Sequence, residues 1–393
     1  MVLVFSCLAI LALLYQLGAL LALWSFRRRP QLVRHQGPLP GITVLKPLRG
    51  VDEDTAACLS SFVAQDYPLF QVLFGVAEVT DPVVPLVEEL QRRYPDRDLQ
   101  LVHCPQHLGS NPKVSTLQQL LPQATHDLLV ISDSDVLAPP DLLQHLATAL
   151  QNPRLGVTSC LYRAGSPETL GSALEALAIS ADFIPSVAVA HYLEGVRFAL
   201  GAVMAIRRET LTQIGGLASM ADYLADDYQL GWRAAQAGWQ VSVLPLVVAT
   251  LQRRTTVKGF LAHQLRWART YRVCRPRGFL GYGITFALIW SLVAWWASGF
   301  TGGTALLVGC CFLGRALVAW QAAKLLGQAP WSWQLLLLLP GKDILSFGLW
   351  ALSFCGDSVI WQGRRYRVQP DGRLTEIPGK ERHESQRPDQ ALD

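Results

Sequence analysis

The sequence predicts an α/β nucleotide-binding domain with a mostly parallel sheet, combined with α-helical transmembrane segments. Within residues 41–277, short apolar runs alternate with longer stretches of helical periodicity, which is typical of strands and helices around a parallel sheet. Long apolar runs lie before and after this region. The 393 residues are 51% hydrophobic, which is more apolar than an ordinary soluble protein.

The N-terminal apolar run, residues 1–26, carries no charge and is long enough to cross about 30 Å of hydrocarbon as a helix. Arginines follow it from Arg27 to Arg29, whereas a signal peptide carries its charge before the apolar core. The run is therefore predicted to be a retained transmembrane anchor. Because positive residues favour the cytoplasmic side, we expect the chain after Arg27 to begin in the cytoplasm.

Five short apolar runs in the α/β region are predicted to be strands: Ile42–Leu45, Gln71–Ala77, Leu99–His103, Leu128–Ser132 and Gly156–Leu161. Helical patterns occupy much of the space between them, notably Val83–Tyr94, Leu117–Leu121 and Pro140–Gln151. Ligands of such sheets bind at the carboxyl ends of the strands. Acidic residues fall there in this sequence.

The C-terminal part turns apolar again, and its predicted membrane segments, within residues 278–358, are Gly278–Phe300, Thr304–Leu326 and Trp331–Cys355. The second segment contains Arg315 and the third contains Lys342 and Asp343. Such charges are costly in lipid unless they pair or face protein. An Arg315–Asp343 pair would satisfy this requirement.

The membrane topology contains a conflict. Three spans after a cytoplasmic domain would place the basic tail, residues 359–393, outside, yet its arginines favour the inside. One segment is therefore expected not to cross. Residues 331–355 are the best candidate for a re-entrant or interfacial hairpin, because Pro340-Gly341 interrupts them. The end of the tail, from Gly379 to Asp393, is charged and predicted to be disordered.

Composition argues against two classes of site. The chain has 34 basic and 30 acidic residues, a net charge of +4, and this excess is too small to indicate a nucleic-acid partner. Its 8 cysteines are scattered and form no C-x-x-C pair or Cys/His cluster with zinc-ligand spacing. They are interpreted as reduced structural thiols.

The sharpest chemical signal is a pair of aspartates, Asp133 and Asp135, which lie two positions apart directly after the apolar run Leu128–Ser132. Such a pair can hold one divalent cation, Mg²⁺ or Mn²⁺, that bridges the diphosphate of a nucleotide donor. The alternative is a strand-end turn capped by aspartates.

A second signal is the adjacent pair Asp226-Asp227, which precedes the helical pattern Gln229–Gly238. One of these carboxylates can act as a general base that removes the proton of an acceptor hydroxyl. The alternative is that an aspartate here caps the following helix.

A third signal is the segment from His263 to Thr270, which contains Arg266-Trp267 and ends the α/β region just before the apolar part. Arginine binds phosphate oxygens bidentately and tryptophan stacks on flat groups, so the pair suits a diphosphate leaving group. The alternative is an interfacial helix with snorkelling arginines and a belt tryptophan.

In this order the three signals resemble family-2-type glycosyltransferases, and their surroundings resemble the ceramide glucosyltransferase family over nearly the whole chain. The stretches that carry the resemblance are Leu45–Asp52, Gln65–Pro68, Asn111–Lys113, Ile131–Ser134, Gly201–Gly216, Ala225–Tyr228, Arg266–Trp267 and Trp361–Tyr366. The resemblance implies a GT-A-like fold, with residues 41–277 as a cytoplasmic glycosyltransferase domain.

The resemblance also implies how a UDP-sugar donor is bound. Asp81 would contact the nucleotide with Glu78 just before it, and Lys113 would lie near the nucleotide. Asp133 and Asp135 would hold the divalent cation and the diphosphate. The implied cofactor is Mn²⁺ or Mg²⁺.

The same resemblance makes Asp227 the base and assigns the leaving group to Arg266 and Trp267, with inversion at the anomeric carbon. One departure concerns the acceptor. The family usually has Gln or Arg three positions before the Arg-Trp pair, where this chain has His263, followed by Gln264. This variant looks more like bacterial relatives, including the hopanoid-associated glycosyltransferases.

The expected function is transfer of a hexose from a UDP-sugar to a lipid hydroxyl, with UDP-glucose and ceramide or a ceramide-like lipid as the leading pair. Transfer of N-acetylglucosamine to a hopanoid polyol is the alternative, and a membrane transporter or scaffold is the alternative from another class. The expected partners are the donor, the lipid acceptor and the bilayer. The expected location is a bacterial inner membrane, crossed several times, with the catalytic domain in the cytoplasm.

Overall fold

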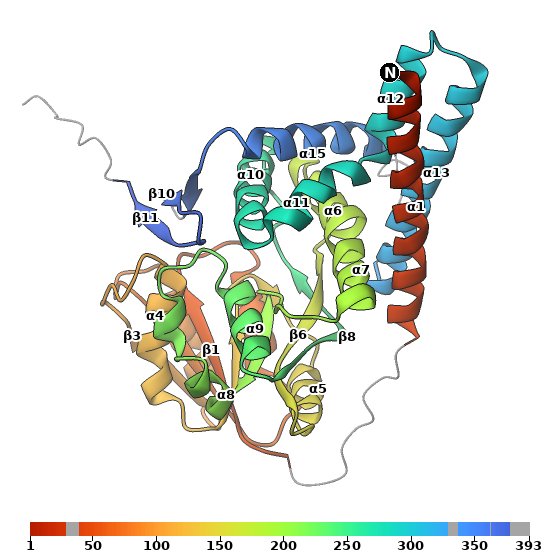
Figure 1. Cartoon of the computed structure of the whole chain (residues 1–393). Coiled ribbons are helices and arrows are strands. Elements are labelled where there is room, and N and C mark those ends of the chain that lie inside the picture. The colour runs from red at the N-terminus through yellow and green to blue at the C-terminus, as the bar shows by residue number, and fades with distance from the viewer. Residues whose placement is uncertain (29–38, 329–336, 362, 378–393) are drawn as a thin grey trace, which may run out of the picture.

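The computed structural model describes residues 1–28, 39–328, 337–361 and 363–377. An α/β domain forms its base, a group of long helices stands along one side, and a small sheet lies at the opposite side (Figure 1). The predicted disordered end, Gly379–Asp393, and the beginning of the third apolar segment, residues 331–336, lie outside the described residues.

An eight-stranded sheet with the order β3-β2-β1-β4-β7-β6-β8-β5 forms the centre of the α/β domain. Its strands are β1 (Ile42–Leu48), β2 (Phe70–Val76), β3 (Asp98–His103), β4 (Leu128–Ser132), β5 (Val136–Leu137), β6 (Leu155–Ala164), β7 (Val203–Arg207) and β8 (Gln240–Thr250). The β3-β2-β1-β4 half is parallel, and β7 runs antiparallel between β4 and β6. All five predicted strands are present, and the mostly parallel α/β fold is confirmed.

The helices of this domain are α2 (Thr55–Val63), α3 (Val84–Arg93), α4 (Pro112–Leu120), α5 (Leu142–Ala149), α8 (Arg208–Gln213) and α9 (Asp226–Gln236). Helix α4 begins five residues before the predicted start at Leu117. The cause is local, because the Asn111 side chain accepts a hydrogen bond from the Val114 amide and Pro112 occupies the first turn.

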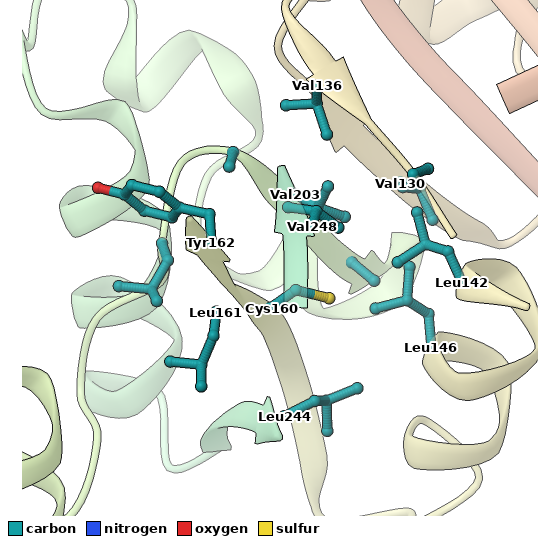
Figure 2. Close-up of a cluster of buried hydrophobic side chains, with 14 of the residues drawn as sticks. Val130, Val136, Leu142, Leu146, Cys160, Leu161, Tyr162, Val203, Leu244 and Val248 are labelled. Atoms are coloured by element: carbon teal, nitrogen blue, oxygen red, sulfur yellow. The ribbon is translucent and has the colours of Figure 1, made fainter. Parts of the chain in front are cut away.

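Both faces of the sheet are buried. On β4, Val130 packs into one apolar cluster whereas Leu129 and Ile131 pack into another on the opposite face, as the alternation of side chains along a strand requires. Figure 2 shows the first cluster, where Val130 lies with Cys160 and other side chains of β6, β7, β8 and α5. With both faces covered, the carboxyl ends of the strands form the edge open to a ligand.

Among the described residues, three helical stretches are each long and apolar enough to cross a membrane: Val2–Arg27, Leu170–Glu194 and Gly302–Leu325. The first is α1 and the last is α13. Beside them lies α12 (Ala287–Ala297), bent by 50° from the preceding α11 (Pro276–Tyr282) and η4 (Gly283–Thr285). Helices α1, α12 and α13 pack side by side (Figure 1). A multi-helix membrane protein is therefore the architecture, as the sequence predicted.

Residues 170–194 were not predicted as an apolar helix of membrane length. They form α6 (Leu170–Ala178), a π-helical turn η2 (Ile179–Phe183) and α7 (Ile184–Glu194). This helix lies between the α/β domain and α1 (Figure 1). The second half of α1 packs with it, because Ala22 and Leu23 belong to the same buried cluster as Val187 and Ala188.

Two further helices lie above the α/β domain in the view of Figure 1: α10 (Val257–Cys274), which packs against α6, and α15 (Leu339–Ser353), which packs on α10. Residues from Pro340 to Asp343 form the first turn of α15, not the bend of a hairpin, because proline is tolerated where a helix has no N–H bond to make. Helix α15 has 15 residues and is not among the described helices long enough to span.

The segment predicted to begin a basic tail folds into a three-stranded antiparallel sheet, β9 (Ser358–Trp361), β10 (Arg364–Val368) and β11 (Leu374–Glu376). We call it the C-terminal sheet. The Leu374 amide donates to the Asp222 carbonyl at 2.6 Å, and Tyr366, only 1% exposed, packs against Leu224. The C-terminal sheet is thus attached to the loop that precedes α9.

Candidate active site

One cavity of about 1840 Å³ lies at the carboxyl edge of the sheet. Its polar end is lined by the predicted site residues Glu78, Asp81, Lys113, Asp133, Asp135, Asp227 and Arg266. Its other end reaches the long helices, where Tyr15, Ile179, Val187 and Leu349 line it. The structure therefore brings all the predicted residues to one cavity, which continues to apolar helices.

Asp133 and Asp135 follow β4 directly, as the sequence indicated. The Asp133 carboxylate lies 2.8 Å from the Lys113 ammonium, and the Gln252 amide donates to Asp135 at 2.8 Å. Burial and the neighbouring Asp133 raise the pKa of Asp135. Within the described part of the chain, no group of three or more His, Cys, Asp or Glu side chains could hold a metal ion.

This pair nevertheless fits a hard divalent cation. Magnesium and manganese commonly take one or two protein carboxylates and complete their shell with water and substrate phosphates. Asp133 already binds a positive group in this structure, because the Lys113 ammonium forms an ion pair with its carboxylate. The donor set of Asp133 and Asp135 is therefore compatible with the predicted ion.

Lys113 links two of the predicted acidic motifs. Its ammonium lies 2.8 Å from Asp133 and 3.1 Å from Asp226. Burial alone would lower the pKa of Lys113, but Asp133 and Asp226 more than offset it and raise that pKa. Lys113 is therefore a fixed positive charge at the polar end of the cavity.

Lys46, on β1, received no role from the sequence. It is fully buried, and its ammonium donates to the Asp133 carbonyl at 2.6 Å and to the Ser132 hydroxyl at 3.2 Å. It also lies 3.9 Å from the centre of the Phe62 ring. Burial lowers the pKa of Lys46 to about 8. Lys46 therefore holds the backbone of the turn at Asp133 in place through its hydrogen bond to the Asp133 carbonyl.

Asp226 and Asp227 form the first turn of α9. The residue before the helix, Ala225, makes no side-chain cap, and Asp226 is bound by Lys113. The Asp227 carboxylate accepts a hydrogen bond from the Tyr228 amide in this first turn at 2.7 Å. Asp227 faces Gly201, where an added Cβ would lie 3.0 Å from a carboxylate oxygen. Burial and the adjacent Asp226 raise the pKa of Asp227 to about 6.

Arg266 and Trp267 lie on α10 at the wall of the cavity. The Trp267 ring is part of an aromatic group with Phe183 of η2 at 5.6 Å and Tyr271 at 6.0 Å between ring centroids. Burial lowers the pKa of Arg266, and Glu175 opposes this effect. Trp267 is therefore held by protein aromatics, while Arg266 is placed to meet an anion.

The unusual residue His263 has a specific partner. Its Nδ1 lies 3.0 Å from the buried Glu175 carboxylate on α6, and Gln264 donates to the same carboxylate at 3.2 Å. The His263 ring also contacts Trp267, with 4.7 Å between centroids. Glu175, which the sequence analysis missed, therefore sets the position of α10 at the cavity.

Asp81 and Glu78 lie at the rim of the polar end. The Asp81 carboxylate accepts hydrogen bonds from the Gly50 amide at 3.0 Å and from the Val83 amide at 2.9 Å. It thus holds the loop after β1, while Glu78 is exposed beside it.

Charges at the helical end of the cavity form a buried cluster. Arg315 of α13 binds Asp343 of α15 at 2.9 Å and also binds Asp182 of η2. Lys342 binds the same two aspartates. The predicted Arg315–Asp343 pair is therefore present, and the cluster ties α13 and α15 to the wall of the cavity.

Comparison with known proteins identifies the family. The sequence matches Glycosyl transferase family 21 over residues 4–374. The chain belongs to this family. The match extends from α1 to the C-terminal sheet, so the long helices and that sheet are parts of the family's architecture.

Among curated relatives, ceramide glucosyltransferase 3 of Caenorhabditis elegans is 23% identical over 65% of this chain and 56% of its own length. Ceramide glucosyltransferase of Komagataella phaffii is 34% identical over 33% of this chain and 28% of its own length. The chain thus spans about half or less of the length of these relatives. These matches confirm the resemblance to the ceramide glucosyltransferase family.

A solved structure confirms the GT-A-like fold. The mannosyltransferase of Pyrobaculum calidifontis, in complex with GDP-Man and Mn²⁺, superimposes with a TM-score of 0.52 at 20% identity. The match covers 89% of this chain and 99% of that one.

Proposed function

We propose that this family 21 protein transfers a hexose from a UDP-sugar to the hydroxyl of a membrane lipid, with UDP-glucose and ceramide or a ceramide-like lipid as the leading pair. The observation that carries the proposal is the single cavity, which joins the charged strand edge to the apolar helices. A water-soluble donor and a lipid acceptor need both environments in one site. The names of the curated relatives support ceramide as the acceptor.

The polar end supplies donor binding. Asp133 and Asp135 would hold a divalent cation, which neutralises the charge that develops on the departing diphosphate. Arg266 would bind the same diphosphate through its planar fork. Lys113 lies beside Asp133, and Asp81 with Glu78 would face the nucleotide at the rim.

Asp227 would act as the base. Its carboxylate takes the proton of the acceptor hydroxyl while that oxygen forms a bond to the anomeric carbon. The bond from this carbon to the diphosphate oxygen breaks on the opposite side, so the configuration inverts and UDP leaves. Trp267 would shape the wall between the sugar and the acceptor, because its ring packs on Phe183 at the passage towards the helices.

The fold also supports a membrane topology without the conflict found in the sequence. If α1, α12 and α13 cross while α15 lies along the surface, three crossings place the α/β domain and the C-terminal sheet on the same side. The arginines after α1 and those of α10 then share this side, which the positive-inside rule makes cytoplasmic. In this arrangement α1 is the first span, residues 41–277 face the cytoplasm and residues 278–358 contain the remaining membrane helices.

The test is product identification with the purified full-length protein in detergent. UDP-glucose and UDP-N-acetylglucosamine, each carrying a labelled sugar, are offered with ceramide or with a hopanoid polyol in the presence of Mn²⁺. We expect labelled glucosylceramide, and none from Asp227→Asn. A labelled hopanoid would replace the proposed acceptor and sugar. Absence of every labelled lipid would contradict the enzyme and favour the transporter or scaffold alternative.

A further inference from the structure

The C-terminal sheet brings two further side chains to the cavity. They belong to none of the three motifs described above, and the proposed chemistry gives them no role. Trp361 ends β9 and Arg364 begins β10, and the two residues pair across the hairpin. Both line the cavity. They belong to the stretch Trp361–Tyr366, which carried part of the family resemblance without any assigned role.

The attachment of the sheet places this hairpin at the polar end. The Leu374 amide binds the Asp222 carbonyl at 2.6 Å, and the Ser110 amide binds the Asp222 carboxylate at 2.9 Å. The Asn111 side chain donates to the Tyr223 carbonyl at 2.8 Å. The same loop therefore contacts the sheet on one side and the beginning of α4, which carries Lys113, on the other.

Strand β10 presents its residues alternately to two faces. Tyr366 and Val368 are buried on the inner face, and Arg364 shares that face because it lies two residues before Tyr366. Arg365 points to the opposite face, where its guanidinium lies 3.4 Å from the Ser358 hydroxyl, and it does not line the cavity. Two adjacent arginines thus differ in access to the site.

The Arg364 guanidinium contacts the Tyr366 hydroxyl and the Glu376 carboxylate in this structure. Its nearest carboxylate, Glu376, lies at 3.6 Å, and both side chains are 50% exposed. An exposed pair at this distance contributes little, so the guanidinium can exchange it for a stronger anion. Nucleotide diphosphates are such anions, because their oxygens accept two parallel N–H bonds from one guanidinium.

We propose that the C-terminal sheet forms a wall of the donor site, in which Arg364 binds a phosphate oxygen of the nucleoside diphosphate and Trp361 packs beside it. The inference rests on the proposed UDP-sugar donor. It adds residues from the far end of the chain to a site otherwise built from residues 45–267. The donor pocket is then complete only when the C-terminal sheet is docked.

The experiment measures binding of UDP with Mn²⁺, by calorimetry, to the full-length protein in maltoside detergent, which contains no phosphate. A charge-assisted hydrogen bond contributes about 1.5–3 kcal/mol, so we expect Arg364→Ala to weaken UDP binding at least about tenfold. Arg364→Lys keeps the charge and should recover part of the affinity. Arg365→Ala is the matched control and should bind UDP as the unchanged protein does.

Uridine without phosphates should bind the Arg364→Ala variant as well as it binds the unchanged protein. If Arg364→Ala binds UDP normally, or if Arg365→Ala loses as much affinity, the proposal is overturned. Binding of phosphatidylglycerol vesicles that falls with Arg364→Ala, while UDP binding does not, would assign Arg364 to a lipid phosphate and also overturn it. An unchanged protein that binds no UDP would instead refute the proposed donor, which separates the two failures.

Discussion

The raised pKa of Asp227 predicts an acid limb in the pH profile of sugar transfer. Burial and the neighbouring Asp226 raise this pKa from 3.8 to about 6, a shift of about 3 kcal/mol in favour of the protonated carboxyl group. A general base must be ionised. The rate should therefore be nearly independent of pH above about 7 and fall as the pH decreases through 6, to about one tenth at pH 5.

The raised pKa of Asp227 also makes the free energy of unfolding depend on pH. Its contribution increases as the pH falls, which is the opposite of the dependence for an ion-paired aspartate with a lowered pKa. Between about pH 4 and 6 the folded protein holds a proton on Asp227 that the unfolded chain has released, so this group favours folding more as the pH falls. Ionised Asp227 opposes folding above pH 6. Asp227→Asn should consequently raise the midpoint of thermal unfolding at pH 7.5, although it abolishes transfer.

Initial rates at saturating donor and Mn²⁺, measured across this pH range, test the cause of the shift. Asp226→Asn removes the adjacent negative charge, so the acid limb should move to lower pH. Asp127→Asn is the control, because Asp127 lies at the other end of β4 with its side chain 93% exposed. A rate that stays constant down to pH 4.5, or a limb that Asp226→Asn does not move, would refute the reasoning.

Three further predictions follow from the contacts of the site and of the helices. Asp133→Asn or Asp135→Asn should abolish transfer and Mn²⁺-dependent UDP binding with the fold retained by circular dichroism, and full activity in EDTA would contradict this. Lys46→Met should weaken Mn²⁺ binding, measured by electron paramagnetic resonance, with little loss of stability. The control on the same strand, Thr43→Val, should lower the free energy of unfolding by about 1–3 kcal/mol and leave Mn²⁺ binding unchanged. Equal Mn²⁺ affinities of the two variants would refute the role of Lys46. Arg315→Met should destabilise the protein by about 3–5 kcal/mol, because it leaves Lys342 as the one cation in the cluster against the two carboxylates of Asp182 and Asp343. An unchanged unfolding midpoint in detergent would show that Arg315 contributes nothing.

Local patterns predicted those parts of the fold that depend on short stretches of sequence. The run Leu128–Ser132 forms β4 with the predicted bounds, since its apolar side chains fit a strand buried on both faces. The same logic failed for β8, which is apolar but contains Pro245. In the structure this proline lies where the register between β6 and β8 shifts, after Leu244 and before Val247, and a bulge of this kind tolerates a residue without an N–H group.

The C-terminal sheet was missed because its arginines were interpreted as part of a basic tail. The signal was present, since Tyr366 and Val368 alternate with Arg365 and Arg367 as one buried face of a strand requires. Lys46 could not have been recognised in the same way. Its importance comes from Asp133, 87 positions away in sequence, and only the pairing of β1 with β4 brings the two together.

The position of α1 changes the interpretation of the N-terminal helix, which the sequence presented only as an anchor. Tyr15, near its middle, lines the same cavity as Asp227, and its second half packs against α7 in the main buried cluster. The helix that holds the protein in the bilayer is thus also a wall of the proposed acceptor passage. A lipid can then keep its tails among α1, α7 and α11 while its hydroxyl reaches the base, so the acceptor need not leave the membrane for the sugar to be transferred.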